Sequence, residues 1–329
     1  MEKDKKLSVA FVTFEKYEGR KDIASSRIRA EWLCNNWDEA EIYKQGKKYD
    51  VLIFQKAYWW EMAEKFDGIK IFDLCDPDFL YWGYHTKDML ENVDYVTTST
   101  EELAKQLSHF SNVPVVRIPD RIEFKEHVRQ KIHRGRAKNV VWFGYSDNFP
   151  MIDPVFNYLE KYKLNLIVIS NKNYLAPYHM VRPEIEVGMS EKEIQKVLEQ
   201  QDKKFWINVT NLKWTRETVN NDILKGDIVI NPTSTKGKWK YKSNNKTLTA
   251  WALGMPVAQN VDDLERLLDH GERIKEAEKY RVKLKENYDV KQSVEDYKSI
   301  ISEIENDKFL NNEANKKFKE YGGGGNEKK

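Results

Sequence analysis

Short runs of apolar and β-branched residues alternate with segments of helical periodicity, and this rhythm occurs twice along the chain. The runs are apolar throughout rather than alternating with polar residues, which is typical of parallel strands buried on both faces. In the first half we expect helices at 25–37, with Ser25 and Ser26 as N-caps, and at 100–110. The strands expected in this half lie at 7–14, 49–56, 69–76, 93–99 and 113–119.

The second half repeats the pattern. Helices are expected at about 154–162, at 247–254, where Gly254 ends the helix, and over 262–306. The strands expected in this half lie at 139–145, 164–170, 205–212, 226–232 and 255–259.

Two such halves predict an α/β fold of two Rossmann-like domains that face a cleft, with the C-terminal helices packed back on the N-terminal domain. The expected division of the chain is an N-terminal domain, a charged linker, a ligand-binding domain, a helix that returns to the N-terminal domain and a disordered tail rich in Asn, Lys and Gly. These parts are expected at 1–120, 121–138, 139–285, 286–308 and 309–329.

Composition narrows the classes of protein. Apolar residues make up 40% of the 329 residues and charged residues 33%, which excludes a disordered chain, and a net charge of +2 excludes a polycationic coat protein. Cys34 and Cys75 are too few for a disulfide scaffold or a zinc site, and the histidines lack ligand spacing, so no bound metal is expected. Without a signal peptide or a long apolar window, we expect a cytoplasmic protein.

The turn after the strand at 226–232 is the best candidate for chemistry. A helix begins behind it, and the N–H groups and positive dipole end of a helix suit a diphosphate. An ordinary capped helix with solvated lysines is the alternative, because no glycine-rich fingerprint is present. The side chains expected to contact the phosphates are Lys242, Ser243, Asn244, Asn245 and Lys246.

A resemblance to a known family supports the phosphate interpretation. DILKGDIVINP (222–232) and KSNNKTLTAWALGMPVA (242–258) resemble the donor-binding half of GT-B glycosyltransferases of the retaining, family 4-like group. The resemblance covers about residues 7 to 306, because further segments follow in the order of that group. These are SSRIRA (25–30), KIFDLCDP (70–77), VDYVTTSTEELAKQL (93–107), VVRIPDRIEF (115–124) and VVWFGY (140–145).

The resemblance implies transfer of a hexose from a nucleotide diphosphate sugar, UDP-hexose above all, to an acceptor hydroxyl with retention, and without a bound cofactor. It places the ribose and base near Thr249, Val209 and Thr210. The chain departs from the group where Tyr241 and Thr249 replace two glutamates, the second of which would bind the ribose. A non-catalytic nucleotide- or carbohydrate-binding module is therefore an alternative.

The N-terminal half supplies the other candidates. Ser26 and Arg27, at the start of the first helix, could face the donor phosphates, or be a cap and a surface arginine. Asp73 and Asp76 end a strand and His85 follows it, so we expect these three to bind the acceptor hydroxyl or take its proton. A capped turn and a structural histidine are the alternatives.

The acceptor is the least determined partner. Segment 56–66 combines tryptophans with lysines and suits an acceptor surface, a peripheral membrane contact at the inner face, or burial against the sheet. A surface glycan, polymer or lipid-linked acceptor is expected, and a hydroxylated base in DNA is the alternative. The basic and aromatic residues of 236–242 could approach a nucleic-acid backbone, and a flexible loop over the donor is the simpler explanation. A dinucleotide-dependent oxidoreductase is not expected, since no GxGxxG follows the first strand.

Overall fold

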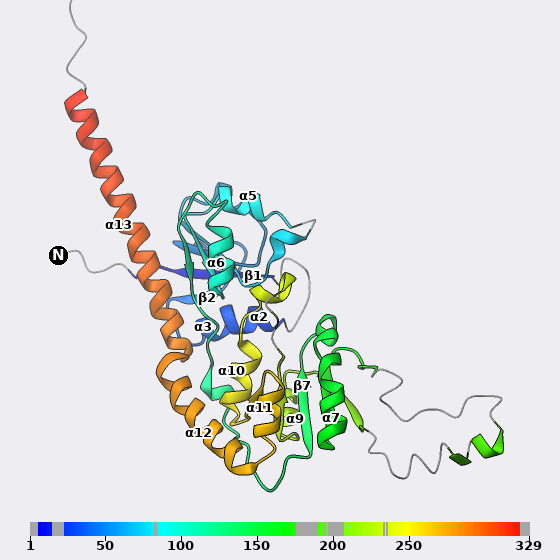
Figure 1. Ribbon diagram of the computed structural model, residues 1–329. Coiled ribbons are helices and arrows are strands. Elements are labelled where there is room, and N and C mark those ends of the chain that lie inside the picture. Colours follow the sequence, from blue (N-terminus) through cyan, green and yellow to red (C-terminus); the bar gives the residue numbers. More distant parts are fainter. Residues whose placement is uncertain are drawn as a thin grey trace, which may run out of the picture. The chain divides into compact units, whose positions relative to one another are not determined.

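The computed structural model describes residues 6–14, 23–81, 84–175, 190–193, 195–196, 207–232, 234 and 236–322, the last of these to residue 308 with side chains. The chain forms two compact units (Figure 1). Unit 1 comprises Met1–Arg121, Tyr241–Ser243 and Val290–Lys329, and unit 2 comprises Ile122–Lys240 and Asn244–Asp289. Residues 15–22 lie outside the described residues, as do residues 205–206, the first two of the strand predicted at 205–212.

Unit 1 contains a six-stranded parallel sheet of order β2-β1-β3-β4-β5-β6. Strands β1, β3 and β5 are buried at every position, because helices cover both faces, and this explains why β1 and β3 are apolar up to their last residue. The strands are β1 (Val9–Thr13), β2 (Ala40–Ile42), β3 (Val51–Gln55), β4 (Ile69–Leu74), β5 (Tyr95–Thr98) and β6 (Val115–Arg117).

The first helix of unit 1 begins earlier than the serines suggest. Its N-cap is Ile23, so the prediction that Ser25 and Ser26 cap it is wrong. Both serines lie inside the first turn, and the Ser26 hydroxyl donates to Gln55 Oε1 across a buried 3.1 Å contact instead. The helices of this unit are α2 (Ala24–Ser26), the π-helix η1 (Arg27–Glu31), α3 (Trp32–Cys34), α4 (Trp60–Lys65), the 3-10 helix η2 (Asp78–Leu80), α5 (Thr86–Glu91), α6 (Glu101–Leu107) and α13 (Val290–Gly322).

Helix α13 joins unit 1 and continues to Gly322, further than the sequence analysis expects. The disordered tail expected from residue 309 is thus helical to residue 322, because Asn, Lys, Glu and Ala in this stretch permit a helix that has already been nucleated. Among the described residues, no helix has the length and apolarity that a bilayer crossing requires.

A buried ion pair lies at the centre of unit 1. Arg29, only 4% exposed, donates through Nε and Nη2 to the two carboxylate oxygens of Asp73 at 2.8 and 2.6 Å, and through Nη1 to Asp120 Oδ1 at 2.8 Å. Thr97 donates to Asp73 Oδ1 and lies 3.2 Å from the hydroxyl of Tyr297 on α13. This network joins the first helix, the central strands and the C-terminal helix of the unit.

Unit 2 contains a five-stranded parallel sheet of order β11-β10-β7-β8-β9. The strands are β7 (Asn139–Phe143), β8 (Asn165–Ser170), β9 (Val209–Lys213), β10 (Ile228–Ile230) and β11 (Val257–Ala258). Two all-parallel sheets with helices between their strands confirm the predicted α/β class with two parallel-sheet domains.

Helix α10 of unit 2 ends as the sequence predicts. Gly254 has φ +69, and Met255 N donates to Ala250 O at 2.9 Å, which is the hydrogen-bond pattern of a glycine-terminated helix. The helices of unit 2 include α7 (Phe156–Tyr162), α9 (Val219–Ile223), α10 (Asn245–Ala252), α11 (Val261–Arg266), α12 (His270–Asn287) and the 3-10 helices η3 (Phe124–Glu126), η4 (Ser146–Met151), η5 (Asp153–Val155) and η7 (Gly237–Tyr241).

The charged segment after residue 121 belongs to unit 2 rather than to a free connection. Gln130 donates to Ala252 O at 2.6 Å, and His133 Nε2 lies 2.9 Å from Gly254 O. The buried Arg273 of α12 donates to the carbonyl oxygens of Arg134 and Gly135. These bonds fix the segment against the C-terminal end of α10.

Replacing Asp73 by Ala should destabilise unit 1 strongly. The variant leaves the Arg29 charge buried without its bidentate partner, and breaking a buried pair in this way typically costs about 3–5 kcal/mol. Urea unfolding monitored by circular dichroism should show this loss. Lys44→Ala, which breaks the exposed pair between Lys44 and Glu41, should leave the transition unchanged. Equal urea midpoints for Asp73→Ala and Lys44→Ala would show that the buried pair of Arg29 and Asp73 does not stabilise unit 1.

Candidate functional site

Ligands of open parallel sheets bind at the carboxyl ends of the strands. Each unit has its own group of charged and polar side chains at this edge.

In unit 2 a glycine and a lysine meet where β7 ends. Gly144 has φ +152, its N–H donates to Ile169 O, and its carbonyl accepts a hydrogen bond from Ser170 Oγ at 2.7 Å. A side chain at Gly144 would place Cβ only 2.8 Å from Cε and Nζ of Lys246. The Lys246 ammonium therefore lies directly against the glycine, 4.7 Å from the centre of the Trp142 ring.

Helix α10 begins at the same edge. Its N-cap residue Asn244 provides no side-chain hydrogen bond to the first turn. The buried Thr247 accepts a hydrogen bond from Asn231 Nδ2 at 3.0 Å, which fixes the start of the helix beside the end of β10. The N-terminus of α10, with its dipole and first-turn N–H groups, and the Lys246 cation beside Gly144 thus lie at the same edge of the sheet, a combination that suits a phosphate group.

The residues predicted around this turn divide between the two units. Asn244, Asn245 and Lys246 belong to unit 2, whereas Lys242 and Ser243 belong to unit 1. Within unit 1, Lys242 Nζ is bound by Asp76 Oδ1 at 2.6 Å, and the expectation that Lys242 shares a phosphate group with Lys246 stays a prediction. Thr249 lies half-buried in the second turn of α10.

Val209 and Thr210 lie at the wrong edge of the sheet for a ligand-binding role. They pair with Leu166 and Ile167 at the start of β8, so they form the amino-terminal end of the edge strand β9. Val209 also packs against the apolar core. The expectation that they contact a ribose or base is therefore wrong, because their side chains lie at the opposite ends of the strands from Gly144.

In unit 1 two lysines and two aspartates form a cluster after β3 and β4. Lys56 Nζ lies 2.8 Å from Asp76 Oδ2 and 3.3 Å from Asp78 Oδ2, and Lys242 Nζ binds the other oxygen of Asp76. The hydroxyl of Tyr58 donates to Asp78 Oδ2 at 2.6 Å. Lys56 has φ +52, a conformation in which a non-glycine residue is strained, so the structure holds its ammonium group here at a cost.

The charges of this cluster stabilise one another. Burial by itself would raise the pKa of Asp76, but Lys56 and Lys242 hold that pKa well below its usual range. Burial also raises the pKa of Asp78, which the Lys56 charge only partly offsets. A carboxylate stabilised as strongly as that of Asp76 is a weak base. The ion pairs therefore favour a role for Asp76 in holding the two lysines, and not the predicted role of proton acceptor.

Three other residues predicted at the site contact neighbouring side chains of unit 1. Asp73 is fully buried and both its oxygens bind Arg29, so the prediction that it contacts an acceptor is wrong. Ser26 is also fully buried and its hydroxyl donates to Gln55, and its expected contact with a donor phosphate stays a prediction. The guanidinium of Arg27 lies 5.8 Å from the centre of the Trp32 ring and is half-buried.

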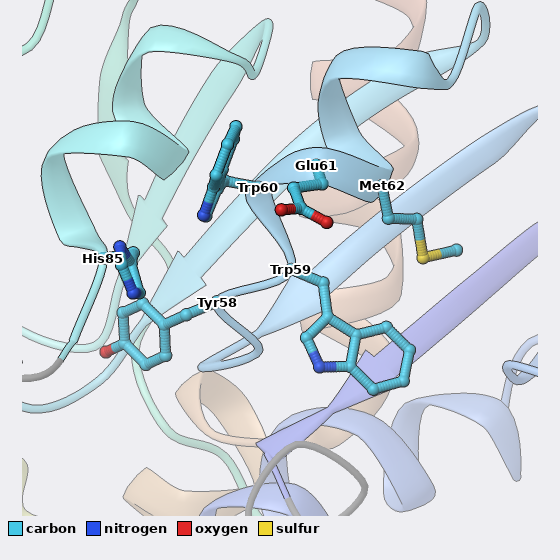
Figure 2. Close-up of a pocket in the computed structure, with 6 residues that line it drawn as sticks. All are labelled: Tyr58, Trp59, Trp60, Glu61, Met62 and His85. Atoms are coloured by element: carbon cyan, nitrogen blue, oxygen red, sulfur yellow. The ribbon is translucent and has the colours of Figure 1, made fainter.

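His85 is not part of the charged cluster of unit 1. Its Nδ1 is 2.7 Å from Asp88 Oδ2, and its ring centre is 6.5 Å from that of Trp60. His85 lines a pocket of about 400 Å³ in unit 1, shown in Figure 2. The other lining residues are Tyr58, Trp59, Trp60, Glu61 and Met62.

Sequence reasoning missed Lys56, Asp78 and Gly144. Lys56 directly follows β3 and Gly144 directly follows β7, and that position at the carboxyl end of a strand is the available signal. Asp78 stands two residues after Asp76, where only the fold reveals that Tyr58 and Lys56 surround it.

Comparisons with known proteins give remote likenesses. No model of a known protein family matches the chain, and no curated protein sequence matches it. The chain is similar to the structure of T4 phage BGT in complex with its UDP-glucose substrate, with 11% identity over 91% of this chain and 98% of that one and a TM-score of 0.44. It is also similar to an α,α-trehalose-phosphate synthase (UDP-forming) from Burkholderia vietnamiensis, with 12% identity over 76% of this chain and 70% of that one and a TM-score of 0.46.

A third likeness is to the glycosylation-associated Gap123 complex from Streptococcus agalactiae, with 10% identity over 77% of this chain and a TM-score of 0.40. The chain spans 54% of the length of that protein, about half. Likenesses of this size do not carry a function over to this chain.

Replacing Asp76 by Asn should produce a pH-dependent loss of stability. Because the folded-state pKa of Asp76 is depressed, its contribution to the free energy of unfolding is present above the usual value of about 3.9 and is lost as pH falls through the lower folded-state pKa. We expect Asp76→Asn to cost about 1–3 kcal/mol at pH 7, between the values for exposed and buried pairs. Below about pH 4 the difference from the unmodified protein should shrink.

Urea unfolding at a series of pH values measures this difference. Asp67→Asn, which changes an exposed aspartate of unit 1, should have little effect at any pH. A loss that is independent of pH would show that the carboxylate charge of Asp76 is not what holds the two lysines.

Proposed function

We propose that the protein is a glycosyltransferase that moves a hexose from a nucleotide diphosphate sugar, a UDP-hexose above all, to an acceptor hydroxyl. The observation that carries this proposal is the contact between Lys246 and Gly144 at the start of α10. A cation, a helix N-terminus and a glycine without a side chain meet at the carboxyl ends of parallel strands, where a diphosphate binds best.

The chemistry follows from charge. In the transfer, the bond between the sugar C1 and the diphosphate oxygen breaks, and a bond from C1 to the acceptor oxygen forms. Negative charge develops on the leaving diphosphate, so Lys246 and the N–H groups of α10 would stabilise the transition state more than the ground state. With retention, the leaving phosphate oxygen accepts the proton of the acceptor hydroxyl, and no strong protein base is needed.

His85 is the proposed site residue on the acceptor side. Its contact with Asp88 orients the imidazole, in the way that a carboxylate orients a catalytic histidine, and it lines a pocket large enough for a small ligand. The acceptor proposed is a surface glycan, a polymer or a lipid-linked sugar. A lipid-linked acceptor would bring the protein to a membrane surface.

Replacing Lys246 by Ala should weaken binding of the nucleotide diphosphate. A ligand at 100 times its Kd stabilises a protein by about 2.7 kcal/mol. A thermal-shift screen with UDP, GDP, ADP, CDP and TDP should therefore identify one stabilising diphosphate. Losing one charge-assisted contact should weaken its binding about tenfold. Lys236→Ala, an exposed lysine in the preceding loop, is the control. An unchanged shift in Lys246→Ala would exclude this turn as the diphosphate site.

Replacing Gly144 by Ala should have the same effect without removing any charge. The new Cβ would displace the Lys246 ammonium from its place beside the glycine. Gly46→Ala is the matched control, because Gly46 also has a positive φ, of +83, but nothing lies within 4 Å of the added carbon. The control should lose stability from backbone strain alone and keep the affinity for the diphosphate measured by calorimetry.

Turnover distinguishes an enzyme from a binding module. We expect slow release of UDP from UDP-glucose or a related donor without acceptor, and loss of that release in Lys246→Ala. Binding of the diphosphate without any release of sugar, from every donor of the matching nucleotide, would favour the non-catalytic module. Transfer to duplex DNA with hydroxymethylated bases, with binding that falls steeply as salt rises, would instead favour the DNA-modifying alternative.

A further inference from the structure

The pocket of unit 1 is built almost entirely by the amino end of one short helix. Trp59 is the N-cap of α4, Trp60 and Glu61 are its first two residues, and Tyr58 precedes it. Figure 2 shows the carboxylate of Glu61 between the indoles of Trp59 and Trp60. The opening has a volume of about 400 Å³. This lies within the range of about 300–1,000 Å³ that small-molecule sites occupy.

The lining combines aromatic faces with the exposed carboxylate of Glu61. Trp59 and Trp60 are each half-buried, so their rings are fixed by the core of the unit while part of each surface stays open. Glu61 is exposed, and among the described residues its carboxylate makes no hydrogen bond or ion pair. A fixed aromatic surface beside an available hydrogen-bond acceptor favours a ligand that has both an apolar face and hydroxyl groups.

The charge of the pocket excludes other ligand classes. No lysine or arginine lines it, so a phosphate or another anion would meet only the negative Glu61. A purely apolar ligand would give no hydrogen bond to the Glu61 carboxylate or to the second ring nitrogen of His85, Nε2. A pyranose ring stacks its C–H face on an indole and directs its hydroxyl groups to carboxylate and imidazole, so it matches the indole, Glu61 and His85 of the lining.

The pocket also shares a wall with the charged cluster of the same unit. The ring of Tyr58 lines the pocket, and its hydroxyl binds Asp78, which lies 3.3 Å from Lys56. A ligand in the pocket therefore lies next to the carboxyl ends of β3 and β4, where the substrates of parallel sheets bind.

We propose that this pocket binds a neutral sugar ring, stacked on Trp60 and hydrogen-bonded to Glu61, and that this ring is the acceptor. The sugar-binding role needs nothing from the donor site, whereas the acceptor role rests on the proposed function. In the acceptor role, a hydroxyl of the bound ring faces His85, and its oxygen forms the new bond to C1 of the transferred hexose.

The test is binding of the full-length protein to an array of neutral oligosaccharides, followed by titration of the best ligand with tryptophan fluorescence as the signal. Trp60→Ala should weaken binding about tenfold, the effect of losing one stacking contact on an aromatic ring. Trp60→Phe should restore part of the affinity. Glu61→Gln changes an exposed residue and should weaken binding severalfold without changing the melting temperature, so it keeps the test valid if Trp60→Ala does not fold.

Tyr81→Ala, which removes an exposed aromatic side chain of unit 1 outside the pocket, is the matched control and should bind normally. The inference would be overturned if the protein bound none of the oligosaccharides. It would also be overturned if Trp60→Ala and Glu61→Gln both bound the sugar as tightly as the unmodified protein. Binding of choline chloride or of anionic phospholipid vesicles that depends on Trp60 would also overturn it, in favour of a quaternary ammonium site or a membrane contact.

The two proposals fail separately. If the protein binds a sugar but no nucleotide diphosphate, the proposed function and the acceptor role are contradicted, whereas the sugar site is supported. Diphosphate binding that depends on Lys246, together with transfer that is insensitive to Trp60 and Glu61, would leave the proposed function and exclude this pocket as the acceptor site.

Discussion

Almost nothing of the Arg29 guanidinium reaches solvent, and its charge is balanced by Asp73 and Asp120 and by the carbonyl of Ile118. A charge in such a place is tolerated only when its partners are held in position, so the elements that carry them must all be docked before the pair is stable. Those elements are the first helix, β4 and the end of β6. Thr97 and Tyr297 extend the requirement to β5 and α13. The parallel sheet of unit 1 thus depends on one guanidinium for its alignment.

That alignment determines where the chemistry of the unit can lie. Asp73 points into the core, whereas Asp76, three residues later and beyond the end of β4, is one-quarter exposed and binds two lysines. The same short stretch of sequence therefore supplies first a structural carboxylate and then a surface one. In unit 2 the corresponding edge carries Gly144 and Lys246, which meet because β7 and β10 are neighbours in the sheet and the hydrogen bond from Asn231 to Thr247 holds the start of α10 beside the end of β10.

The fold could be predicted from the sequence because its signals are local. Unbroken apolar runs marked the strands, and Gly254 marked the end of α10. The site could be predicted only in part, because a side chain's neighbours depend on distant residues. Lys242 and Lys246 are four positions apart yet belong to different units, and Asp73 and Asp76 look equivalent until Arg29 is seen to bind the first. Val209 and Thr210 were misassigned because the resemblance gave their order in the chain but not which end of β9 they occupy.

The division of the chain between the units has a consequence for its synthesis. Unit 1 draws on three separate stretches, and the last of them, α13, supplies Tyr297 at the buried network around Arg29. A ribosome releases these residues only after all of unit 2 has emerged, although domains generally fold as units in the order of synthesis. The sheet of unit 1 can therefore complete its packing against α13 only after unit 2 has been synthesised. Unit 2, whose residues all precede α13, is the part of the protein that can fold first.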